Sequence, residues 1–355
     1  MKILFAGGGT AGSVSPLLSI YNTVKKIKPE TEFLFVRTKK GDPELNLLRG
    51  YSMKIQSINS GKFRRYFSLK NITDVFLTFI GFIESLFIIK EFKPDVIVGA
   101  GGYISVPVIW AGWVMRKKIL IHQQDIRPSL SNILSINLAN TITVAFEKSL
   151  RDFPSTKTVW TGNPSRKEIL HGKKEQIKNS FGFKDNLPVV LIVGGGTGAV
   201  SLNNIVQNSL EKLVEFSQVI LVTGKDKRIT GIDNPRFRQY EFLVDEMKDA
   251  LSNSVVVVSR AGLSAMTEFS VLGKAVILVP MPKSHQVENA NYLEERDAAV
   301  VLDQRKLSPN KLVDNIQELL NNDNKRRILS DNIKKIMKKD ASESITNEII
   351  KLAEK

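Results

Sequence analysis

The chain has 355 residues, of which 42% are hydrophobic. At about 150 residues per domain this is enough apolar material for two cores, so a disordered chain is excluded. Cysteine is absent from the sequence, which excludes disulfide scaffolds, thiol catalysis and zinc–thiolate sites.

The formal net charge is +15, and most of it lies in residues 1–160, where 22 Lys and Arg stand against 11 Asp and Glu. This asymmetry indicates an anionic partner, such as nucleic acid, a phospholipid surface or a phosphorylated substrate. The three histidines, His122, His171 and His285, lie far apart in the sequence. We therefore expect no protein metal site.

The first predicted element is a buried strand over Lys2–Ala6, which leads into the glycine-rich turn GGGTAG at residues 7–12. A helix is expected to follow as far as about Lys26. The opening apolar run is too short for the hydrophobic region of a signal peptide. A cytoplasmic protein is the resulting expectation.

Short apolar runs then alternate with longer segments of helical period, which is typical of parallel strands joined by crossover helices. After the first strand, the predicted strands cover residues 32–36, 96–98, 118–122, 141–145, 189–193, 219–222, 255–259 and 275–279. They form two series. The first ends near Trp160 and the second starts near Pro188.

The second series opens like the first, with a strand at 189–193, the turn GGGTGA at 194–199 and a helix to about Phe216. Two such openings predict an α/β chain of two Rossmann-like domains with parallel sheets that face each other across a cleft. Residues 161–166, TGNPSR, are the expected hinge. The stretch from about Asn310 to Lys355 is helical in pattern and rich in Lys, Asn and Glu, which indicates a solvated helical surface.

A glycine-rich turn between a strand and a helix lets backbone N–H groups and the helix dipole meet an anion. Dinucleotide binding also needs a carboxylate at the end of the next strand, but the two copies have Arg37 and Gly224 there, so NAD is disfavoured. A third glycine cluster, GAGGY at 99–103, follows another strand. Since the carboxyl ends of parallel strands line one crevice, this cluster and the first turn predict two neighbouring phosphate-sized cradles, which suit a pyrophosphate.

In the second domain, SRAGLSAMTE at 259–268 follows a strand and opens a helix. Its small residues let a ligand approach the helix N-terminus, and Glu268 can accept hydrogen bonds from two ribose hydroxyls. An exposed helix carboxylate is the alternative interpretation of Glu268. The polar run HQVENA at 285–290 is either a ligand-binding cluster or an ordinary capped helix start.

Residues 62–92 begin with Lys62, Arg64, Arg65 and Lys70 and continue as a Phe-rich apolar stretch. At about 15 residues, from 75 to 89, and interrupted by Glu84, this stretch is a poor membrane span. Trp110 and Trp113 precede another basic run, 116–118. Apolar contact combined with attraction to anionic headgroups predicts a peripheral membrane surface on the first domain; a crossover helix that faces the core is the alternative.

Taken together, these motifs resemble the MurG glycosyltransferases of peptidoglycan synthesis, which belong to glycosyltransferase family 28. The resemblance runs over nearly the whole chain and is carried by GGGTAG (7–12), PDV (94–96), GGYIS (101–105), HQQD (122–125), GNPSR (162–166), GGGTGA (194–199) and residues 260–268 and 285–290. Members of this family transfer N-acetylglucosamine (GlcNAc) from UDP-GlcNAc, with inversion, to the muramyl sugar of lipid I, undecaprenyl-pyrophosphoryl-MurNAc-pentapeptide, and so form lipid II. The resemblance implies the GT-B fold.

The resemblance also implies a division of labour. Residues 1–162 would form an acceptor and membrane-associated domain, with a C-terminal helix at about 340–355 packed back on it, and residues 163–339 would bind UDP-GlcNAc. In the second domain, the resemblance implies that the donor diphosphate is bound by Arg166, Gly195, Gly196 and Thr197 and that the backbone at Val244 recognises uracil. It implies contacts along the nucleotide from Leu263, Ser264, Ala265, Met266 and Thr267. Glu268 would bind the ribose, and His285 and Gln286 would contact the GlcNAc hydroxyls.

For the first domain, the resemblance implies an interdomain cleft near donor sugar and acceptor. Its residues would be Thr10, Ala11 and Gly12, with Asp125 and Asn132 as further substrate contacts and Gly9, Thr10, Gly101, Gly102 and Tyr103 at the acceptor pyrophosphate.

This chain departs from the family pattern at three places. The family's first loop usually ends in Gly-Gly-His, whereas here Ser13 stands in place of the histidine that is often discussed as a base. The family's His-Glu-Gln-Asn is HQQD at 122–125, so the carboxylate has moved by two positions, and the donor loop has Gly196-Thr197 where Ser-Gln is common. Inverting transfer needs a base for the acceptor hydroxyl. Asp125 is the best candidate, because Ser13 cannot act as a base at neutral pH; the alternative is that Asp125 only hydrogen-bonds the donor sugar.

The prediction is thus a metal-independent transferase with no cofactor, since UDP-GlcNAc is a co-substrate, and with helix N-termini and Arg166 stabilising the departing UDP. Lipid I, an anionic membrane surface on the cytoplasmic side and other cell-wall synthesis proteins are the expected partners, and nucleic acid is not. Two alternatives stay open on the sequence alone. They are another GT-B transferase with a lipid acceptor and a UDP-sugar-binding homologue with weakened catalysis.

Overall fold

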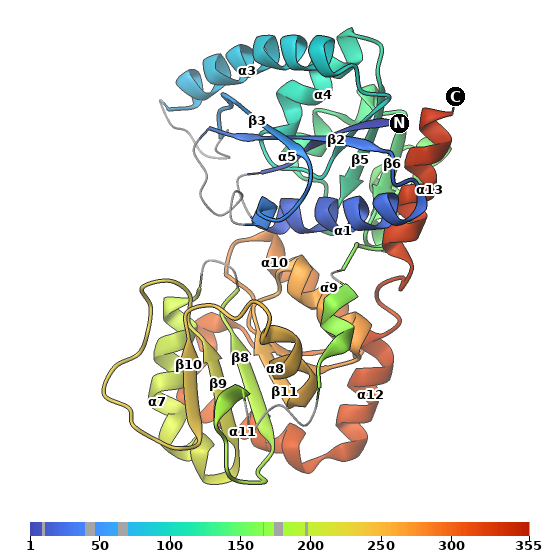
Figure 1. Ribbon diagram of the computed structural model, residues 1–355. Helices are drawn as coiled ribbons and strands as arrows, with labels where there is room; N and C mark the ends of the chain where they lie inside the picture. Colours follow the sequence, from blue (N-terminus) through green and yellow to red (C-terminus); the bar gives the residue numbers. More distant parts are fainter. Residues whose placement is uncertain are drawn as a thin grey trace. The chain divides into compact units, whose positions relative to one another are not determined.

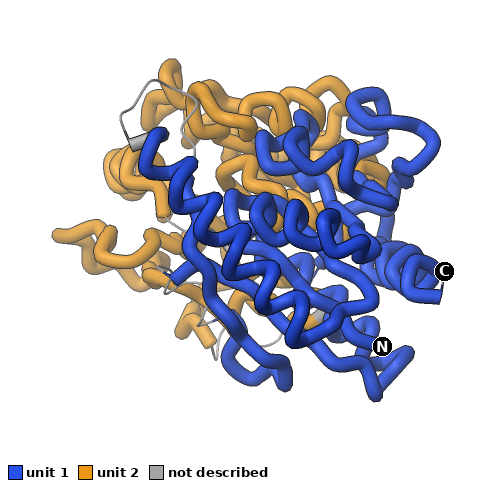
Figure 2. The backbone as a smooth tube through the Cα atoms, turned by 90° about the horizontal axis from the view of Figure 1, so that it is seen from above, with its two compact units in different colours: residues 1–165, 338–355 blue, residues 166–337 orange. Residues whose placement is uncertain are grey.

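The computed structural model describes residues 1–8, 11–39, 47–62, 70–165, 167–173, 180–195 and 198–354. The chain divides into two compact units (Figure 2). Unit 1 comprises Met1–Ser165 and Lys338–Lys355, and unit 2 comprises Arg166–Met337. Each unit is built around its own parallel sheet (Figure 1), so the predicted α/β class is confirmed.

The sheet of unit 1 has the strand order β3-β2-β1-β4-β5-β6-β7. Its strands are β1 (Lys2–Ala6), β2 (Glu32–Thr38), β3 (Lys54–Ile58), β4 (Val96–Gly99), β5 (Lys118–Gln123), β6 (Thr141–Val144) and β7 (Thr158–Trp160). In β1, Ile3 and Phe5 pack into the core on one face of the sheet, while Leu4 and Ala6 pack on the other. A parallel sheet that is covered on both faces requires such strands, apolar on both sides.

Helices cover both faces of this sheet. On one face, α1 (Ala11–Ile27) packs against α13 (Ala341–Ala353), as Figure 1 shows, and Ile345, Ile349 and Leu352 of α13 are buried in the shared core. On the other face lie α3 (Lys70–Phe92) and α4 (Ser105–Val114). The remaining short helices of the unit are α5 (Leu130–Ile133), η1 (Ile136–Leu138), η2 (Glu147–Asp152) and η3 (Ser155–Lys157).

The sheet of unit 2 has the order β10-β9-β8-β11-β12-β13. Its strands are β8 (Val189–Val193), β9 (Gln218–Val222), β10 (Phe237–Tyr240), β11 (Ser254–Ser259), β12 (Ala275–Leu278) and β13 (Val300–Val301). The helices are η4 (Lys167–His171), α7 (Val200–Phe216), α8 (Met247–Asn253), α9 (Leu263–Leu272), α10 (His285–Glu294), η6 (Gln304–Lys306), α11 (Pro309–Asn321) and α12 (Asp323–Ile333).

Local sequence signals fix the ends of several helices in unit 2. Helix α11 starts with Pro309 after the capping side chain of Ser308, and α9 ends at Gly273, which has a φ of +64°; both are common terminal residues for these roles. The C-terminal stretch is more than the predicted solvated surface. Its apolar residues enter the cores, with Leu312, Ile316 and Leu319 of α11 buried in unit 2 and α13 buried in unit 1.

Helix α3 is longer than expected, because Glu84 does not interrupt it. The Glu84 carboxylate turns inward, where it accepts hydrogen bonds from Lys39 Nζ (2.7 Å) and from the backbone N–H (2.6 Å) and side-chain Nδ2 (2.7 Å) of Asn59. Burial alone would raise the pKa of Glu84, but these hydrogen bonds outweigh it and lower the pKa below its ordinary value. By length and composition, Ile72–Phe92 could cross a membrane, and only 22% of its most apolar part is buried. The apolar stretch is therefore longer than the 15 or so residues predicted from the sequence.

Candidate active site

Two glycine loops of unit 1 lie against each other at the carboxyl ends of neighbouring strands. Gly7 and Gly8 follow β1, and residues 100–103 follow β4, which pairs with β1. Gly102 has a φ of +77°, and a Cβ on it would lie 2.3 Å from the carbonyl oxygen of Gly8, so only glycine fits there. The structure therefore brings together the two loops that the sequence placed in one crevice. Gly9 and Thr10 lie outside the described residues.

Helix α1 begins at Ala11, directly after the first of these loops, with Gly12 and Ser13 in its first turn. Ser13 is buried, and its hydroxyl donates a hydrogen bond to the carbonyl oxygen of Gly8 at 3.2 Å. This contact fixes the glycine loop to the start of the helix. This structural contact explains why a serine stands at this position, and it requires no role of the hydroxyl in proton transfer.

Gln123, at the end of β5, holds the following loop together from inside. Its side chain is buried, and its Nε2 donates to the carbonyl oxygens of Asp125 (2.7 Å) and Arg127 (2.8 Å). Its Oε1 accepts from the backbone N–H of Ser129 (3.2 Å) and from Asn132 Nδ2 (2.7 Å). A carboxylate could not donate to the two carbonyl oxygens, so this loop needs Gln at the position where the family has Glu.

The same loop presents Asp125 next to the glycine cluster. Gln124 Nε2 donates to the carbonyl oxygen of Ala100 at 2.8 Å, which ties the loop to residues 99–103. Asp125 is half-buried. Asn132 is buried, and its Nδ2 donates to the carbonyl oxygen of His122 as well as to Gln123. Its amide nitrogen thus supports the loop, and its Oδ1 has no hydrogen-bond partner among the described residues.

His122, in β5, is fully buried and lies between β6 and the segment that leads out of unit 1. Its Nδ1 lies 2.9 Å from Thr143 Oγ1 and its Nε2 lies 3.0 Å from Asn163 Oδ1. Burial lowers the pKa of His122 to about 4, against the opposing effect of the hydrogen bond with Asn163. At neutral pH the ring is therefore uncharged and holds the loop and the connecting segment in place.

This buried histidine predicts a loss of stability in acid. Since the folded pKa lies below the unfolded value of about 6.5, the unfolded chain binds more protons as the pH falls from about 6.5 to 4, at a cost of about 3 kcal/mol. We expect the melting temperature of a His122→Gln variant to fall less between pH 7 and pH 4.5 than that of the unmodified protein. His171→Gln, at an exposed position, is the matched control and should leave the pH dependence unchanged. Equal slopes for the His122 variant and the unmodified protein would contradict this assignment.

In unit 2, the second glycine turn leads into α7. Gly198 has a φ of +70° and packs on the next loop, where a Cβ would lie 2.3 Å from the carbonyl oxygen of Thr223, whereas a Cβ on Gly195 would meet open space. No side chain caps the N-terminus of α7 within the described residues. Among the described residues, its first N–H groups therefore have no side-chain cap, and N–H groups at the start of a helix can bind an anion. Gly196, Thr197 and Arg166, also expected at this site, lie outside the described residues.

Arg260 is a feature of this site to which sequence reasoning gave no role. It follows β11 and is 8% exposed, and it donates to the carbonyl oxygen of Val279 (2.8 Å) and to Ser201 Oγ (2.9 Å) in the first turn of α7. Within the described residues it forms no ion pair with a carboxylate. A buried guanidinium beside a helix N-terminus is unfavourable unless an anion is present. An arginine directly after an apolar strand is the sequence signal for such a residue.

Glu268 lies on α9, and only some side chains in the first two turns of this helix face outward. Ser264, Ala265 and Glu268 are half-buried, whereas the side chains of Leu263, Met266 and Thr267 are buried. Thr267 Oγ1 donates to the carbonyl oxygen of Leu263 within the helix. Contacts from these three residues to a nucleotide would therefore come from their backbone.

The other residues predicted for the donor lie at the same edge of the sheet. Val244 is exposed in the loop after β10, and His285 and Gln286 open α10 after β12, with His285 exposed. Gln286 Oε1 accepts from the backbone N–H of Met281 at 3.0 Å, which holds its side chain against the preceding loop. Because the carboxyl ends of β8, β10, β11 and β12 meet along one edge, these residues and the start of α7 share it.

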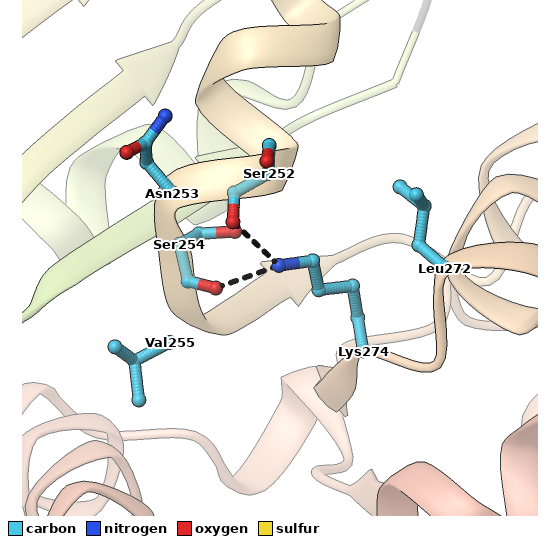
Figure 3. A pocket seen from close by; sticks show the side chains of 6 residues that line it. All are labelled: Ser252, Asn253, Ser254, Val255, Leu272 and Lys274. Atoms are coloured by element: carbon cyan, nitrogen blue, oxygen red, sulfur yellow. Dashed lines mark hydrogen bonds between the residues drawn. The ribbon is translucent and has the colours of Figure 1, made fainter. Parts of the chain in front are cut away.

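A cavity of about 480 Å³ lies in unit 2 at the opposite edge, near the amino ends of β11 and β12 (Figure 3). Lys274 points toward the end of α8, where its Nζ donates to the carbonyl oxygens of Ser252 (3.2 Å) and Ser254 (2.9 Å). The lysine thus fastens two elements together, and the cavity is separate from the glycine turn.

Comparison with known proteins agrees with this arrangement. Residues 3–144 match the glycosyltransferase family 28 N-terminal domain and residues 189–345 match the glycosyltransferase family 28 C-terminal domain. The chain is 35% identical over 98% of its length to a UDP-N-acetylglucosamine–N-acetylmuramyl-(pentapeptide) pyrophosphoryl-undecaprenol N-acetylglucosamine transferase of Bacillus thuringiensis, 99% of which is covered. It is 36% identical over 99% of its length to the protein of that name from Borrelia hermsii, 96% of which is covered.

A solved structure shows the same fold. The crystal structure of MurG from Acinetobacter baumannii matches over 99% of both chains with a TM-score of 0.77 and 23% sequence identity. Both the arrangement of parallel sheets and the sequence likeness thus lead to one family, and the chain belongs to the MurG glycosyltransferases of family 28, with the GT-B fold.

Proposed function

We propose that the protein transfers GlcNAc from UDP-GlcNAc, with inversion, to the muramyl sugar of lipid I and so forms lipid II. The observation that carries this proposal is the full-length likeness to relatives named for this transfer. The geometry supports it, because each unit has a glycine-rich loop that leads into a helix at the carboxyl edge of its own sheet, an arrangement that suits the binding of an anion. Unit 2 is the proposed donor domain and unit 1 the acceptor domain.

For the donor, the start of α7 and Arg260 supply positive potential for the diphosphate, together with Arg166, Gly195, Gly196 and Thr197. The helix N-terminus and the guanidinium would also stabilise the charge on departing UDP without a metal or other cofactor. Ser264, Ala265 and Glu268 face outward on α9 and would lie along the nucleotide, with Glu268 at the ribose. Val244, His285 and Gln286 complete the proposed site at uracil and GlcNAc.

A substitution at Glu268 tests this donor site. Glu268→Ala should raise the KM for UDP-GlcNAc about tenfold to a hundredfold, because a charged group contributes about 1.5–3 kcal/mol through its hydrogen bonds, and the KM for the acceptor should not change. Glu294→Ala, at an exposed position on α10, is the matched control. A KM for UDP-GlcNAc equal to that of the unmodified protein would assign Glu268 to the protein surface instead.

For the acceptor, residues 7–10 and 101–103 form the proposed cradle for the pyrophosphate, with Asp125 as the base on the adjoining loop. Thr10, Ala11 and Gly12 are proposed to lie near the reacting sugars. Asn132 is proposed to contribute to substrate binding by holding the loop that carries Asp125 in place. The basic balance of residues 1–160 suits a phosphorylated lipid acceptor.

Helix α3 supports a membrane surface on unit 1, because the polarity of residues 72–87 is the reverse of that of an ordinary surface helix. Asp74, Gly81 and Ser85 are buried against the protein, and Glu84 is bonded to Asn59 and Lys39. Most apolar residues of this part face outward instead, and Phe76 and Phe87 are 70% and 68% exposed, whereas Ile88, Ile89 and Phe92 at the end of the helix are buried in the core. The outward apolar set is Ile72, Val75, Phe76, Leu77, Phe79, Ile80, Ile83 and Phe87.

Two further groups extend this outward face. Helix α4, which packs against α3, exposes Trp113 and Val114 just before the basic residues Arg116, Lys117 and Lys118. Aromatic residues beside cations suit an interface with anionic lipid. We therefore assign this surface to an anionic bilayer on the cytoplasmic side, with α3 lying along it and held to the protein by its polar side. Other cell-wall synthesis proteins are further expected partners of the enzyme.

Release of UDP tests the transfer and its acceptor. Purified protein with UDP-GlcNAc should release UDP rapidly when lipid I is added and slowly without it. A diacylglycerol acceptor in place of lipid I should give no increase. Release with diacylglycerol alone would instead indicate a glycolipid synthase, and binding of UDP-GlcNAc without any release would indicate a binding protein.

A further inference from the structure

Residues 59–61, between β3 and α3, are fastened along helix α3 by side chains. Glu84 accepts from the backbone N–H (2.6 Å) and Nδ2 (2.7 Å) of Asn59, and Thr78 Oγ1 accepts from the backbone N–H of Gly61 at 3.2 Å. The bonds lie six residues apart on α3. The segment is thus attached to nearly two turns of the helix.

The backbones also approach too closely for any residue but glycine. A Cβ on Gly81 of α3 would lie 1.9 Å from the carbonyl oxygen of Asn59, and a Cβ on Gly61 would lie 1.9 Å from the carbonyl oxygen of Asp74. Each glycine therefore permits one backbone-to-backbone contact. Together with the hydrogen bonds, these contacts leave the segment and the helix little freedom to move separately.

On its other side the segment reaches the acceptor loop. Ser60 Oγ donates to the carbonyl oxygen of Tyr103 at 3.0 Å. Tyr103 follows Gly102, which packs on Gly8. A continuous series of contacts therefore runs from the outward apolar helix through Ser60 to the two glycine loops.

We propose that residues 59–61 are a strap that fixes the acceptor loop relative to the membrane-facing helix, with Ser60 as its positioning residue. This inference rests on the proposed function, since it concerns how a lipid acceptor is met. The prenyl chain stays in the bilayer, so the pyrophosphate emerges at a set height above the surface. A strap that holds the acceptor loop at that height positions it for the pyrophosphate before the acceptor binds, so less conformational freedom of the loop is lost on binding.

The test compares an acceptor held in a membrane with one that is free. Ser60→Ala should raise the KM for lipid I embedded in vesicles of anionic phospholipid about fivefold, the effect of one lost hydrogen bond. The KM for a water-soluble lipid I analogue with a short prenyl chain, the KM for UDP-GlcNAc and the affinity for the vesicles should not change. Ser60→Thr keeps the hydroxyl and should restore the KM. Ser85→Ala, which removes a buried hydroxyl that donates to the carbonyl oxygen of Gly81 within α3, is the matched control.

Two kinetic results would overturn the strap. An equal rise of the KM for both acceptors would mean that Ser60 acts on the cradle alone, and no rise for either would mean that its bond to Tyr103 has no role in acceptor binding.

A second measurement does not depend on turnover and separates the strap from the proposed function. Vesicle binding should slow hydrogen exchange at the backbone amides of residues 101–105 in the unmodified protein but not in Ser60→Ala. Absence of this slowing in the unmodified protein would overturn the strap whether or not transfer is observed. Slowing without any transfer would leave the strap standing and reject the proposed function.

Discussion

Replacing Asp125 with Asn should lower kcat by a factor of about 10² to 10⁴, the usual contribution of a general base, and leave the affinity for UDP-GlcNAc unchanged. Asn has nearly the same shape as Asp. The contact that Gln123 makes with this residue is to its backbone carbonyl oxygen, so the loop should keep its structure. Initial rates with lipid I and calorimetric titration with UDP-GlcNAc give the two quantities.

The matched control for this experiment is Asp152→Asn, at an exposed position in η2, which should be as active as the unmodified protein. A raised KM or Kd for UDP-GlcNAc with an unchanged kcat would show that Asp125 hydrogen-bonds the donor sugar. An unchanged kcat and KM would remove it from the site. In either case the base would have to come from another residue.

Replacing three outward phenylalanines of α3 should abolish membrane binding without harming the fold. Phe76, Phe79 and Phe87 are all exposed, and transfer of each side chain from water to lipid is worth about 1.5–3 kcal/mol. The triple Ser variant should bind vesicles of anionic phospholipid at least about a thousandfold more weakly. Its melting temperature in solution should not fall, because these side chains contribute little to the core.

Ile27→Ser is the control for the loss of an exposed apolar side chain elsewhere in unit 1, and it should bind vesicles normally. Flotation of the protein with the vesicles measures binding. Flotation of the triple variant equal to that of the unmodified protein would contradict the assignment of α3 to the bilayer. A melting temperature well below that of the unmodified protein would show instead that α3 packs on protein.

The nine strands predicted from the sequence are all present, and the four further strands in the described part of the chain are the sheet edges, β3, β7, β10 and β13. Interior strands of a parallel sheet are buried on both faces and appear as unbroken apolar runs, as in β8, where all five residues are buried. An edge strand such as β10, with the sequence FRQY, has one unpaired side and needs no such run. The position of β10 in the sheet is set by its pairing with β9, and composition does not show which strands pair.

The apolar character of α3 was also readable from the sequence, but the direction of Glu84 was not. Periodicity alone made Glu84 an interruption of an apolar segment. Its partners, Lys39 and Asn59, are 45 and 25 residues away in the sequence, and only the folded chain brings them together. The same limit applies to Ser60, whose partner Tyr103 is 43 residues away.

In the candidate site, the glycine turns could be predicted because their function requires a local pattern of strand, turn and helix. The roles of Gln123 and Arg260 could not, because both depend on distant groups. The sequence made Gln123 a departure that weakened the case for activity, whereas the structure shows an amide that joins two carbonyl oxygens to a buried asparagine. Arg260 gains its significance only where it meets Ser201 at the start of α7.

Transfer of radiolabelled GlcNAc from UDP-GlcNAc to lipid I by the purified protein, in vesicles of anionic phospholipid and with EDTA present, tests the central claim most directly. We predict that the label enters the lipid fraction as one GlcNAc joined to the muramyl sugar through a β linkage, since inversion converts the α-linked donor. Label that stays in the aqueous fraction while UDP-GlcNAc is bound, or that enters the lipid only when a divalent metal is added, would contradict this account.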